Sequence, residues 1–218
     1  MRTRIKICCI KSIEEAKTAI ECGADAIGLV GKMPSGPGPI PDGLIKQIAQ
    51  SVPPLVSTFL LTSETYVNEI IKHYNRTRTT TIQIVDLLSE GTYAKIKEAL
   101  PSVKIVQVIH VLDSKSVELA IKISKEVDAL LLDSGNPNLK VKELGGTGRV
   151  HNWNLSKQIR ENSKCPIMLA GGLKPENVQQ AINEVHPFAV DVCTGVRSDG
   201  RLDRNKLEAF VKNIYSGK

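Results

Sequence analysis

The feature that most constrains the fold of this chain is a repeated alternation between two kinds of segment. Short apolar runs rich in β-branched residues are followed by longer amphipathic runs of helical period, and this happens eight times. The expected strands are residues 4–9, 26–30, 56–61, 81–86, 104–111, 129–133, 166–170 and 189–194. The expected helices are residues 12–22, 41–51, 64–74, 92–100, 114–125, a segment starting near 155, 175–185 and 203–215. Repeated strand–helix units form parallel sheets, and eight of them in 218 residues predict an α/β fold, the (β/α)8 TIM barrel.

An open, doubly wound sheet is the alternative architecture. That fold usually carries a glycine-rich fingerprint after its first strand, whereas the first strand here ends in Cys8-Cys9-Ile10. No linker, shift in composition or low-complexity tract divides the chain. We therefore predict a single (β/α)8-barrel domain over residues 1–218.

Composition excludes several other classes of protein. The formal charge is +6, but Lys and Arg are scattered and aromatic residues make up only 4%, so we expect no nucleic-acid partner. An anionic small substrate explains the basic excess, and so does chance. No apolar run approaches the roughly 18 residues that span a bilayer, and the start of the chain has no secretory signal, so we expect a cytoplasmic protein without a membrane partner. The five cysteines match neither a disulfide framework nor a zinc-site spacing, and we expect no metal.

Glycine-bearing segments follow three of the expected strands, on the barrel face where active sites form. They are Gly145, Gly146, Thr147 and Gly148 in the long connection 134–154, Gly171 and Gly172 after strand seven, and Thr194 and Gly195 after strand eight. Each could be merely a tight turn. Glycine also lets backbone N–H groups approach an anion, and barrels often bind phosphate after strands seven and eight. Because the segments converge on one face, we favour a phosphate site.

Cys8 and Asp133 end the expected first and sixth strands. Alternation along the first strand points Lys6 and Cys8 into the barrel and directs Ile7 and Cys9 toward the helices. A thiolate and a carboxyl at one barrel mouth can act as base and acid. From the residues alone, Cys8 is better explained as a core residue than as a catalyst, and Asp133 is equally well explained as a cap.

Six segments in chain order form a recognisable pattern. They are Lys6-Ile7-Cys8, Gly23-Ala24-Asp25-Ala26-Ile27-Gly28, Leu131-Leu132-Asp133-Ser134, Gly145-Gly146-Thr147-Gly148-Arg149 with Trp153-Asn154-Leu155, the stretch 169–178 (LAGGLKPENV), and Ala189-Val190-Asp191-Val192-Cys193-Thr194-Gly195-Val196. Together they resemble the phosphoribosylanthranilate isomerase family. The match extends from Lys6 to about Phe210 and is strongest in the C-terminal half.

The resemblance implies an Amadori rearrangement in tryptophan biosynthesis, on a small phosphorylated sugar derivative and without a cofactor. Asp133 is then the general acid that protonates the furanose ring oxygen, and Cys8 is the general base that removes the C2′ proton. The phosphate lies against Gly146, Thr147, Gly148, Gly171, Gly172, Thr194 and Gly195. A free cysteine titrates near pH 8.5, so Cys8 needs help to be a thiolate. Lys6 could supply that help, but we favour an ion pair between Lys6 and Asp191 because buried charges need partners.

The chain departs from the family pattern where the aromatic end of the substrate is expected. The family's carboxylate-binding arginine is missing from residues 34–40, Val85-Asp86 replaces His-Gly, His110 ends strand five, and Cys9 replaces a glycine. One explanation is divergence, with Arg149 or Lys32 binding the carboxylate. The other is a paralogue that acts on a different phosphosugar, with Asp86 and His110 near the altered group. A phosphate-binding protein without catalysis is a third hypothesis. A monomer and a homodimer are both compatible with the sequence.

Overall fold

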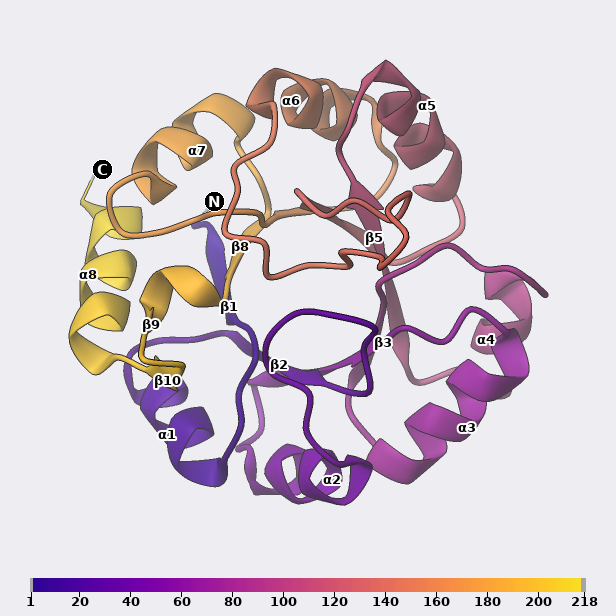
Figure 1. The fold of residues 1–218 in the computed structure, drawn as a ribbon, viewed down its shortest axis with the longest axis horizontal. Coiled ribbons are helices and arrows are strands. Elements are labelled where there is room, and N and C mark those ends of the chain that lie inside the picture. Colours follow the sequence, from indigo (N-terminus) through magenta and orange to yellow (C-terminus); the bar gives the residue numbers. More distant parts are fainter. Residues whose placement is uncertain (1, 217–218) are drawn as a thin grey trace.

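The predicted strand–helix units form a closed parallel barrel. The computed structural model describes residues 2–216, and within this range eight strands close in sequence order from β1 to β8 with β8 paired to β1 (Figure 1). The strands are β1 (Arg4–Ile7), β2 (Ala26–Val30), β3 (Ser57–Thr62), β4 (Thr81–Ile84), β5 (Lys104–His110), β6 (Ala129–Asp133), β7 (Ile167–Leu169) and β8 (Ala189–Val192). The helices are α1 (Ile13–Glu21), α2 (Asp42–Ser51), α3 (Val67–Thr77), α4 (Tyr93–Ala99), α5 (Ser114–Ile123), α6 (Trp153–Asn162), α7 (Val178–Val185) and α8 (Arg204–Tyr215). The TIM-barrel prediction is confirmed.

Two separate apolar layers hold this architecture together. Ile5 and Ile7 of β1 belong to the layer between the sheet and the outer helices, and both are almost completely buried. Phe59, Val106 and Met168 belong to a second layer that fills the barrel interior. The split follows from strand geometry, in which successive side chains point to opposite faces.

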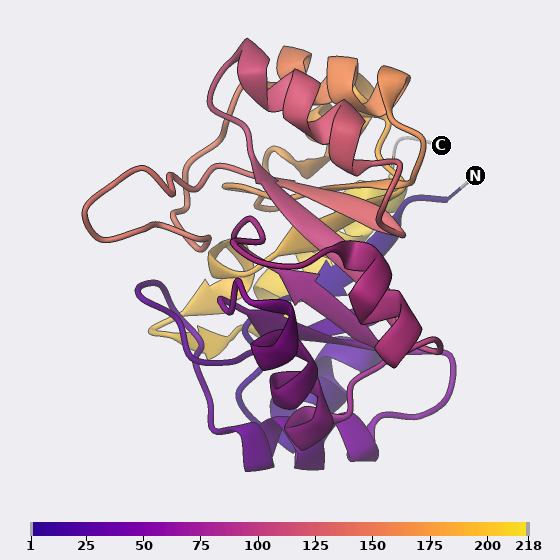
Figure 2. The same ribbon diagram turned by 90° about the vertical axis from the view of Figure 1, so that its right-hand side faces the viewer.

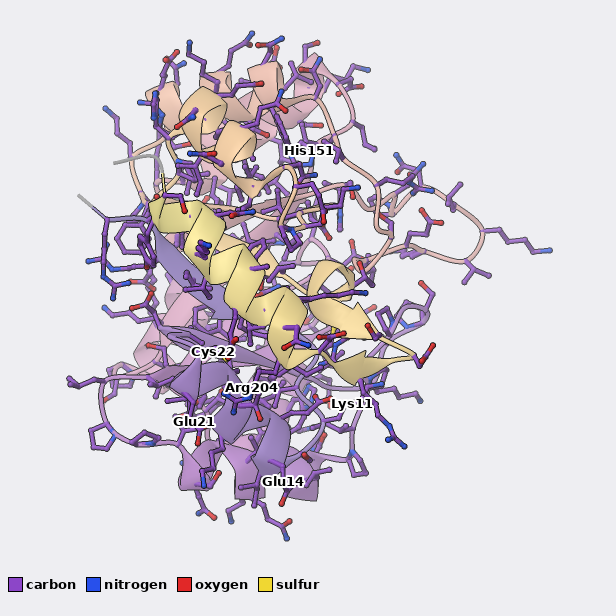
Figure 3. The ribbon with its side chains drawn as sticks, turned by 90° about the vertical axis from the view of Figure 1, so that its left-hand side faces the viewer. Lys11, Glu14, Glu21, Cys22, His151 and Arg204 are labelled. Atoms are coloured by element: carbon purple, nitrogen blue, oxygen red, sulfur yellow. The ribbon has the colours of Figure 1, made fainter. Side chains whose placement is uncertain are left out.

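The first and last parts of the chain meet where the barrel closes. Lys6 of β1 is in register with Asp191 of β8. Outside the sheet, the guanidinium of Arg204 at the start of α8 pairs with the Glu21 carboxylate at the end of α1 (Figure 3). A short hairpin of β9 (Arg197–Ser198) and β10 (Arg201–Leu202) lies between the 3-10 turn η1 (Thr194–Val196) and α8. The sequence did not predict this hairpin, because two-residue strands carry no periodic signal.

The loops at the carboxyl ends of the strands gather at one end of the barrel. The β2–α2 loop (residues 31–41) and the β6–α6 loop (residues 134–152) project there, while both termini lie at the opposite end (Figure 2). The Ser35 hydroxyl donates a hydrogen bond to the carbonyl oxygen of Lys142 at 2.6 Å, so the two loops touch. Within residues 2–216, no helix has the length and apolar character needed to cross a membrane.

Candidate active site

A pocket of about 730 Å³ opens at this loop-bearing end of the barrel. Its floor is formed by inward-facing side chains of the strands, including Leu61, Val108 and Leu131. Its rim is formed by the β2–α2 loop, the β6–α6 loop and the segments that follow β7 and β8. This is the position at which TIM barrels bind their ligands.

Cys8 and Asp133 both line the pocket. Cys8 directly follows β1 and Asp133 ends β6, and these two strands are not neighbours in the barrel. Both side chains are buried from bulk solvent, with 5% and 7% exposed. Cys8 lies against the backbone of Gly28 in β2, where an added Cβ would be 2.8 Å from the Cys8 sulfur and 3.1 Å from Lys6 Nζ. The absence of a side chain at Gly28 therefore makes room for the thiol.

The environment of Asp133 favours its protonated form. Burial raises the pKa of this carboxyl above its ordinary value, and the nearby Asp191 carboxylate acts in the same direction. The Ser134 N–H and His110 oppose the rise without cancelling it. A carboxyl that keeps its proton closer to neutral pH is suited to protonate a substrate.

Lys6 is paired with Asp191 beneath the pocket, as predicted. Its Nζ lies 2.9 Å from the carboxylate, and the two side chains are 1% and 7% exposed. Burial opposes the charge on Lys6, but Asp191 first and the Cys8 thiol second hold its pKa above the ordinary value. The ammonium group also lies over the Phe59 ring, 5.2 Å from its centre.

The prediction that the Cys9 side chain faces the outer helices is wrong. The strand ends at Ile7, and Cys9 has a left-handed backbone with φ of 62°, so alternation no longer sets its direction. Its side chain is 4% exposed and lines the pocket with Cys8 instead of facing the helices.

The structure brings the three glycine-bearing segments together. Gly146, Thr147, Gly148, Gly171, Gly172 and Thr194 all line the pocket. A Cβ at Gly172 would be 2.7 Å from the carbonyl oxygen of Arg149, so this glycine lets the segment after β7 pack under the β6–α6 loop. The N–H groups of Gly171 and Gly172 donate to no backbone acceptor within residues 2–216, and they remain available to an anion. Gly195 is not a lining residue, because it packs against the carbonyl oxygen of Leu173.

The residues expected near the aromatic end of the substrate do not line this pocket. Asp86 pairs with Lys142, and Arg149 pairs with Glu143. His110 makes a hydrogen bond to the carbonyl oxygen of Val85 at 3.0 Å. Among the lining residues that the structure describes there is no Arg, Lys or His.

Cys193 is a pocket residue that the sequence reasoning missed. Asp191 faces the interior, so strand alternation carried two residues further would have placed Cys193 on the same side. Three side chains of the β2–α2 loop, Met33, Ser35 and Pro37, also line the rim. A loop gives no periodic signal from which this could be predicted. No group of three His, Cys, Asp or Glu side chains suited to a metal ion occurs in the described part of the chain.

One known protein family matches nearly the whole of this barrel. The family model described as N-(5′-phosphoribosyl)anthranilate (PRA) isomerase matches residues 5–213. The chain belongs to this family. N-(5′-phosphoribosyl)anthranilate isomerase 2 of Methanosarcina mazei is 35% identical over 210 residues, with 95% of this chain and 92% of the relative covered. The isomerase of Haloarcula marismortui is 34% identical, with 97% and 95% covered.

Solved structures of PRA isomerases have the same barrel. The phosphoribosylanthranilate isomerase of Thermotoga maritima superposes with a TM-score of 0.82 at 28% identity, with 98% of this chain and 99% of that chain covered. Another isomerase structure contains reduced 1-(o-carboxyphenylamino)-1-deoxyribulose 5-phosphate and has a TM-score of 0.78 at 26% identity, with the same coverage.

Proposed function

We propose that this member of the PRA isomerase family converts N-(5′-phosphoribosyl)anthranilate into 1-(o-carboxyphenylamino)-1-deoxyribulose 5-phosphate, a step of tryptophan biosynthesis. The observation that carries the proposal is the placement of Cys8 and Asp133 in one pocket beside the glycine-bearing segments. The solved isomerase with a reduced form of this product supports the choice of substrate.

The proposed reaction consists of proton transfers between the substrate and these two side chains. Asp133 donates its proton to the furanose ring oxygen, the C1′–O bond breaks, and the anthranilate nitrogen supplies the electrons that form a C=N bond. The Cys8 thiolate then removes the proton from C2′, which gives an enolamine. Tautomerisation of the enolamine to the ketone completes an internal redox exchange, in which C1′ is reduced and C2′ is oxidised. No external oxidant or cofactor enters this balance.

The pocket supports opposite roles for the two residues. The raised pKa of Asp133 favours a proton donor. The unpaired N–H groups of Gly171 and Gly172 are placed to bind the phosphate, with Thr147 and Thr194 beside them. We further propose that Asp86, His110 and Arg149 do not contact the substrate directly. Asp86 and Arg149 instead act on the β6–α6 loop, through their ion pairs with Lys142 and Glu143.

The absence of a cation among the described lining residues favours one second candidate, an isomerase acting on a phosphosugar without an anthranilate carboxylate. A carboxylate usually binds a fork-like donor such as arginine. Phosphoribosylanthranilate, made in situ from anthranilate and phosphoribosyl pyrophosphate, separates the two. Loss of its fluorescence with purified protein supports the proposed reaction, and no loss favours the second candidate.

Variants of the two proposed catalytic residues test their roles in the same assay. We expect Cys8→Ala and Asp133→Asn each to lower turnover by about 10² to 10⁴ fold, the usual range for losing a general acid or base. Cys165→Ala and Asp128→Asn are the matched controls. Cys165 and Asp128 precede β7 and β6 at the opposite end of the barrel, so these controls should retain activity. Full activity of either site variant would refute its assigned role.

The oligomeric state stays a prediction of monomer or homodimer. The related isomerase of Thermotoga maritima is dimeric, and one solved structure shows monomers that were generated from it. Light scattering on the purified protein decides between the two states.

A further inference from the structure

The pocket has a glycine-rich side and an apolar side on opposite walls of the barrel. The glycine-bearing segments follow β7 and β8, and in a closed barrel of eight strands β3 and β4 lie diametrically opposite these two. Leu61 of β3 and Val85 after β4 line the far wall, and they share one apolar cluster with Met33 and Leu144 of the two roof loops. A phosphosugar bound at the glycines therefore directs its aromatic end toward this apolar wall.

The substrate of the proposed reaction carries a carboxylate on that aromatic ring, and the pocket lining offers it no positive charge. No Arg, Lys or His occurs among the lining residues that the structure describes. Lys6 is already paired with Asp191 of β8. Arg149 is paired with Glu143, and its backbone packs against Gly172 on the phosphate side. A cation for the carboxylate has to come from the rim beside β4.

Lys142 of the β6–α6 loop is a cation at this part of the rim. Its ammonium forms an ion pair with Asp86, the residue directly after Val85. Its carbonyl oxygen accepts the 2.6 Å hydrogen bond from Ser35, which lines the pocket from the β2–α2 loop. Leu144, two residues further along the chain, is itself a lining residue. Both loops project from this end of the barrel (Figure 2), so Lys142 is attached to the pocket mouth by its backbone and by its side chain.

Asp86 is a fixed anchor for the ammonium group of Lys142. Its carbonyl oxygen accepts a hydrogen bond from Nε2 of Gln107 at 3.0 Å, and its Oδ1 accepts one from the N–H of Leu87 at 2.9 Å. The side chain of Asp86 is 12% exposed, whereas that of Lys142 is 49% exposed. An ammonium group has three N–H donors, and among residues 2–216 the Asp86 carboxylate is the partner of only one of them. The other donors are free for a second carboxylate.

The ion pair does not prevent Lys142 from binding a ligand. Water screens a pair in which the lysine is half exposed, so the pair itself contributes little to stability. The ammonium can therefore share its donors between Asp86 and a carboxylate that arrives at the mouth.

We propose that Lys142 is a specificity-determining residue that binds the carboxylate on the aromatic ring of the substrate, and that Asp86 positions its ammonium group. The ring lies against Leu61 and Val85, and its carboxylate leaves the pocket at the rim where Lys142 is anchored. The inference rests on the proposed function and deepens it, because it supplies the cation that the pocket lining lacks.

Two product analogues that differ only in the carboxylate test the proposal without turnover. One is reduced 1-(o-carboxyphenylamino)-1-deoxyribulose 5-phosphate, the ligand in a solved structure of a related isomerase. The other is reduced 1-phenylamino-1-deoxyribulose 5-phosphate. Isothermal titration calorimetry on the full-length protein gives both Kd values, and their ratio measures recognition of the carboxylate. Effects of a variant on the fold or on the phosphate site cancel in this ratio.

The two members of the ion pair should change this ratio in opposite directions. Lys142→Met should weaken binding of the carboxylated analogue about tenfold and leave the other analogue unchanged, because a charge-assisted hydrogen bond is lost. Asp86→Asn keeps an acceptor for Lys142 but removes a competing negative charge, so it should strengthen binding of the carboxylated analogue about two- to threefold. A pair that only stabilised the rim would weaken binding in both variants.

Other cations of the two loops supply the controls. Lys140→Met changes an exposed lysine of the same loop, two residues from Lys142, and should leave the ratio unchanged. Lys32→Met and Arg149→Met test the two rival cations. Loss of the carboxylate preference in either of these variants, with the preference intact in Lys142→Met, would overturn the proposal.

Turnover of phosphoribosylanthranilate separates failure of this inference from failure of the proposed function. Lys142→Met should raise KM about tenfold with kcat nearly unchanged, as expected when binding energy common to substrate and transition state is removed. A wild type that turns over this substrate but binds both analogues equally well refutes the role of Lys142 alone. A wild type that neither turns it over nor binds either analogue refutes the proposed function and this inference together.

Discussion

At the scale of single residues, the site depends on close approaches that only small side chains permit. Gly28 is the clearest case. It lies in the middle of β2, where its missing side chain leaves space for the Cys8 sulfur and the Lys6 ammonium. Its backbone is not left-handed, so the need for glycine at this position is purely steric.

Gly28→Ala should displace the thiol of Cys8. A methyl group 2.8 Å from the sulfur and 3.2 Å from the Cys8 Cα forces a local shift, for which overpacking costs of about 1–3 kcal/mol are usual. We expect turnover of phosphoribosylanthranilate to fall at least tenfold, with a melting temperature lower by a few degrees. Gly43→Ala in α2 is the control. No atom lies within 4 Å of its added Cβ, and alanine should raise helix stability by about 0.5–1 kcal/mol. Equal activity of the two variants would contradict the steric role.

His151 makes the stability of the fold sensitive to acid. Burial lowers the pKa of its imidazole to about 4. In the unfolded chain this group titrates near 6.5, so between pH 6.5 and 4 the unfolded state binds a proton that the native state does not. The stabilising effect is complete above pH 6.5 and is lost as the pH falls. We expect the free energy of unfolding, measured in urea, to fall between pH 7.5 and pH 5 by about 2 kcal/mol more in wild type than in His151→Gln. The same loss in both proteins would argue against a buried neutral imidazole.

At the scale of elements, the β2–α2 and β6–α6 loops form the roof of the pocket. Ser35 bonds to the backbone of Lys142, and the glycine at position 146 packs directly against the Pro37 ring. Ser134 and Thr147, at the two sides of the β6–α6 loop, share a hydroxyl–hydroxyl hydrogen bond of 2.8 Å. The roof is thus made of contacts of small side chains with one another and with the backbone of these loops.

Gly146→Ala should separate these two loops. Its methyl group would overlap the Pro37 ring, and its φ of 67° is strained for alanine. Gly200→Ala is a matched control, since φ there is 74° but no atom lies within 4 Å. Both variants should lose about 1 kcal/mol of stability from the backbone strain. Only Gly146→Ala should raise KM for phosphoribosylanthranilate, by about tenfold, which corresponds to 1.4 kcal/mol of binding. Equal KM values would exclude the roof from substrate binding.

At the scale of the whole molecule, the closure of the barrel joins the two ends of the chain. The β1–β8 ladder is reinforced by Arg197 after β8 and Glu15 of α1, which form a bidentate pair with N–O distances of 3.0 Å. The Arg197 guanidinium also donates to the carbonyl oxygen of Cys9. The main-chain N–H of Leu202 donates to the same carboxylate at 3.1 Å, so the β9–β10 hairpin is fixed to α1.

Removing one member of this pair should destabilise the closed barrel. The side chains are 6% and 17% exposed, so Glu15→Gln or Arg197→Met leaves a poorly solvated charge, which costs about 3 kcal/mol. The double variant should lose less than the sum of the two. The exposed pair of Glu21 and Arg204 also connects α1 and α8, and Glu21→Gln should cost much less because water screens both charges. Urea unfolding gives the free energy of unfolding of the two single variants, the double variant and Glu21→Gln. Additive losses at Glu15 and Arg197 would show that the pair does not act as a unit.

Much of this molecule was determined by the sequence alone. The strand and helix periods predicted the barrel and placed Cys8 and Asp133 at the carboxyl ends of their strands, because alternation fixes which side chains face inward. The structure ends β1 one residue before Cys8. The pair of Lys6 and Asp191 followed from the same rule and from the cost of an unpaired buried charge. The strand and helix patterns are local and depend on neighbours only a few residues away, whereas the pair of Lys6 and Asp191 also required the expected closure of β8 onto β1.

Tertiary structure decided the rest. Cys9 turned into the pocket because the chain leaves strand geometry after Ile7, and its contacts come from the β2–α2 loop and from Arg197 of β9, both distant in sequence. Asp86 and Arg149 were drawn into ion pairs with Lys142 and Glu143 instead of lining the pocket, since loop packing determines which charges meet. Loops have no period, and contacts between them are set only when closure of the barrel brings distant segments to one rim.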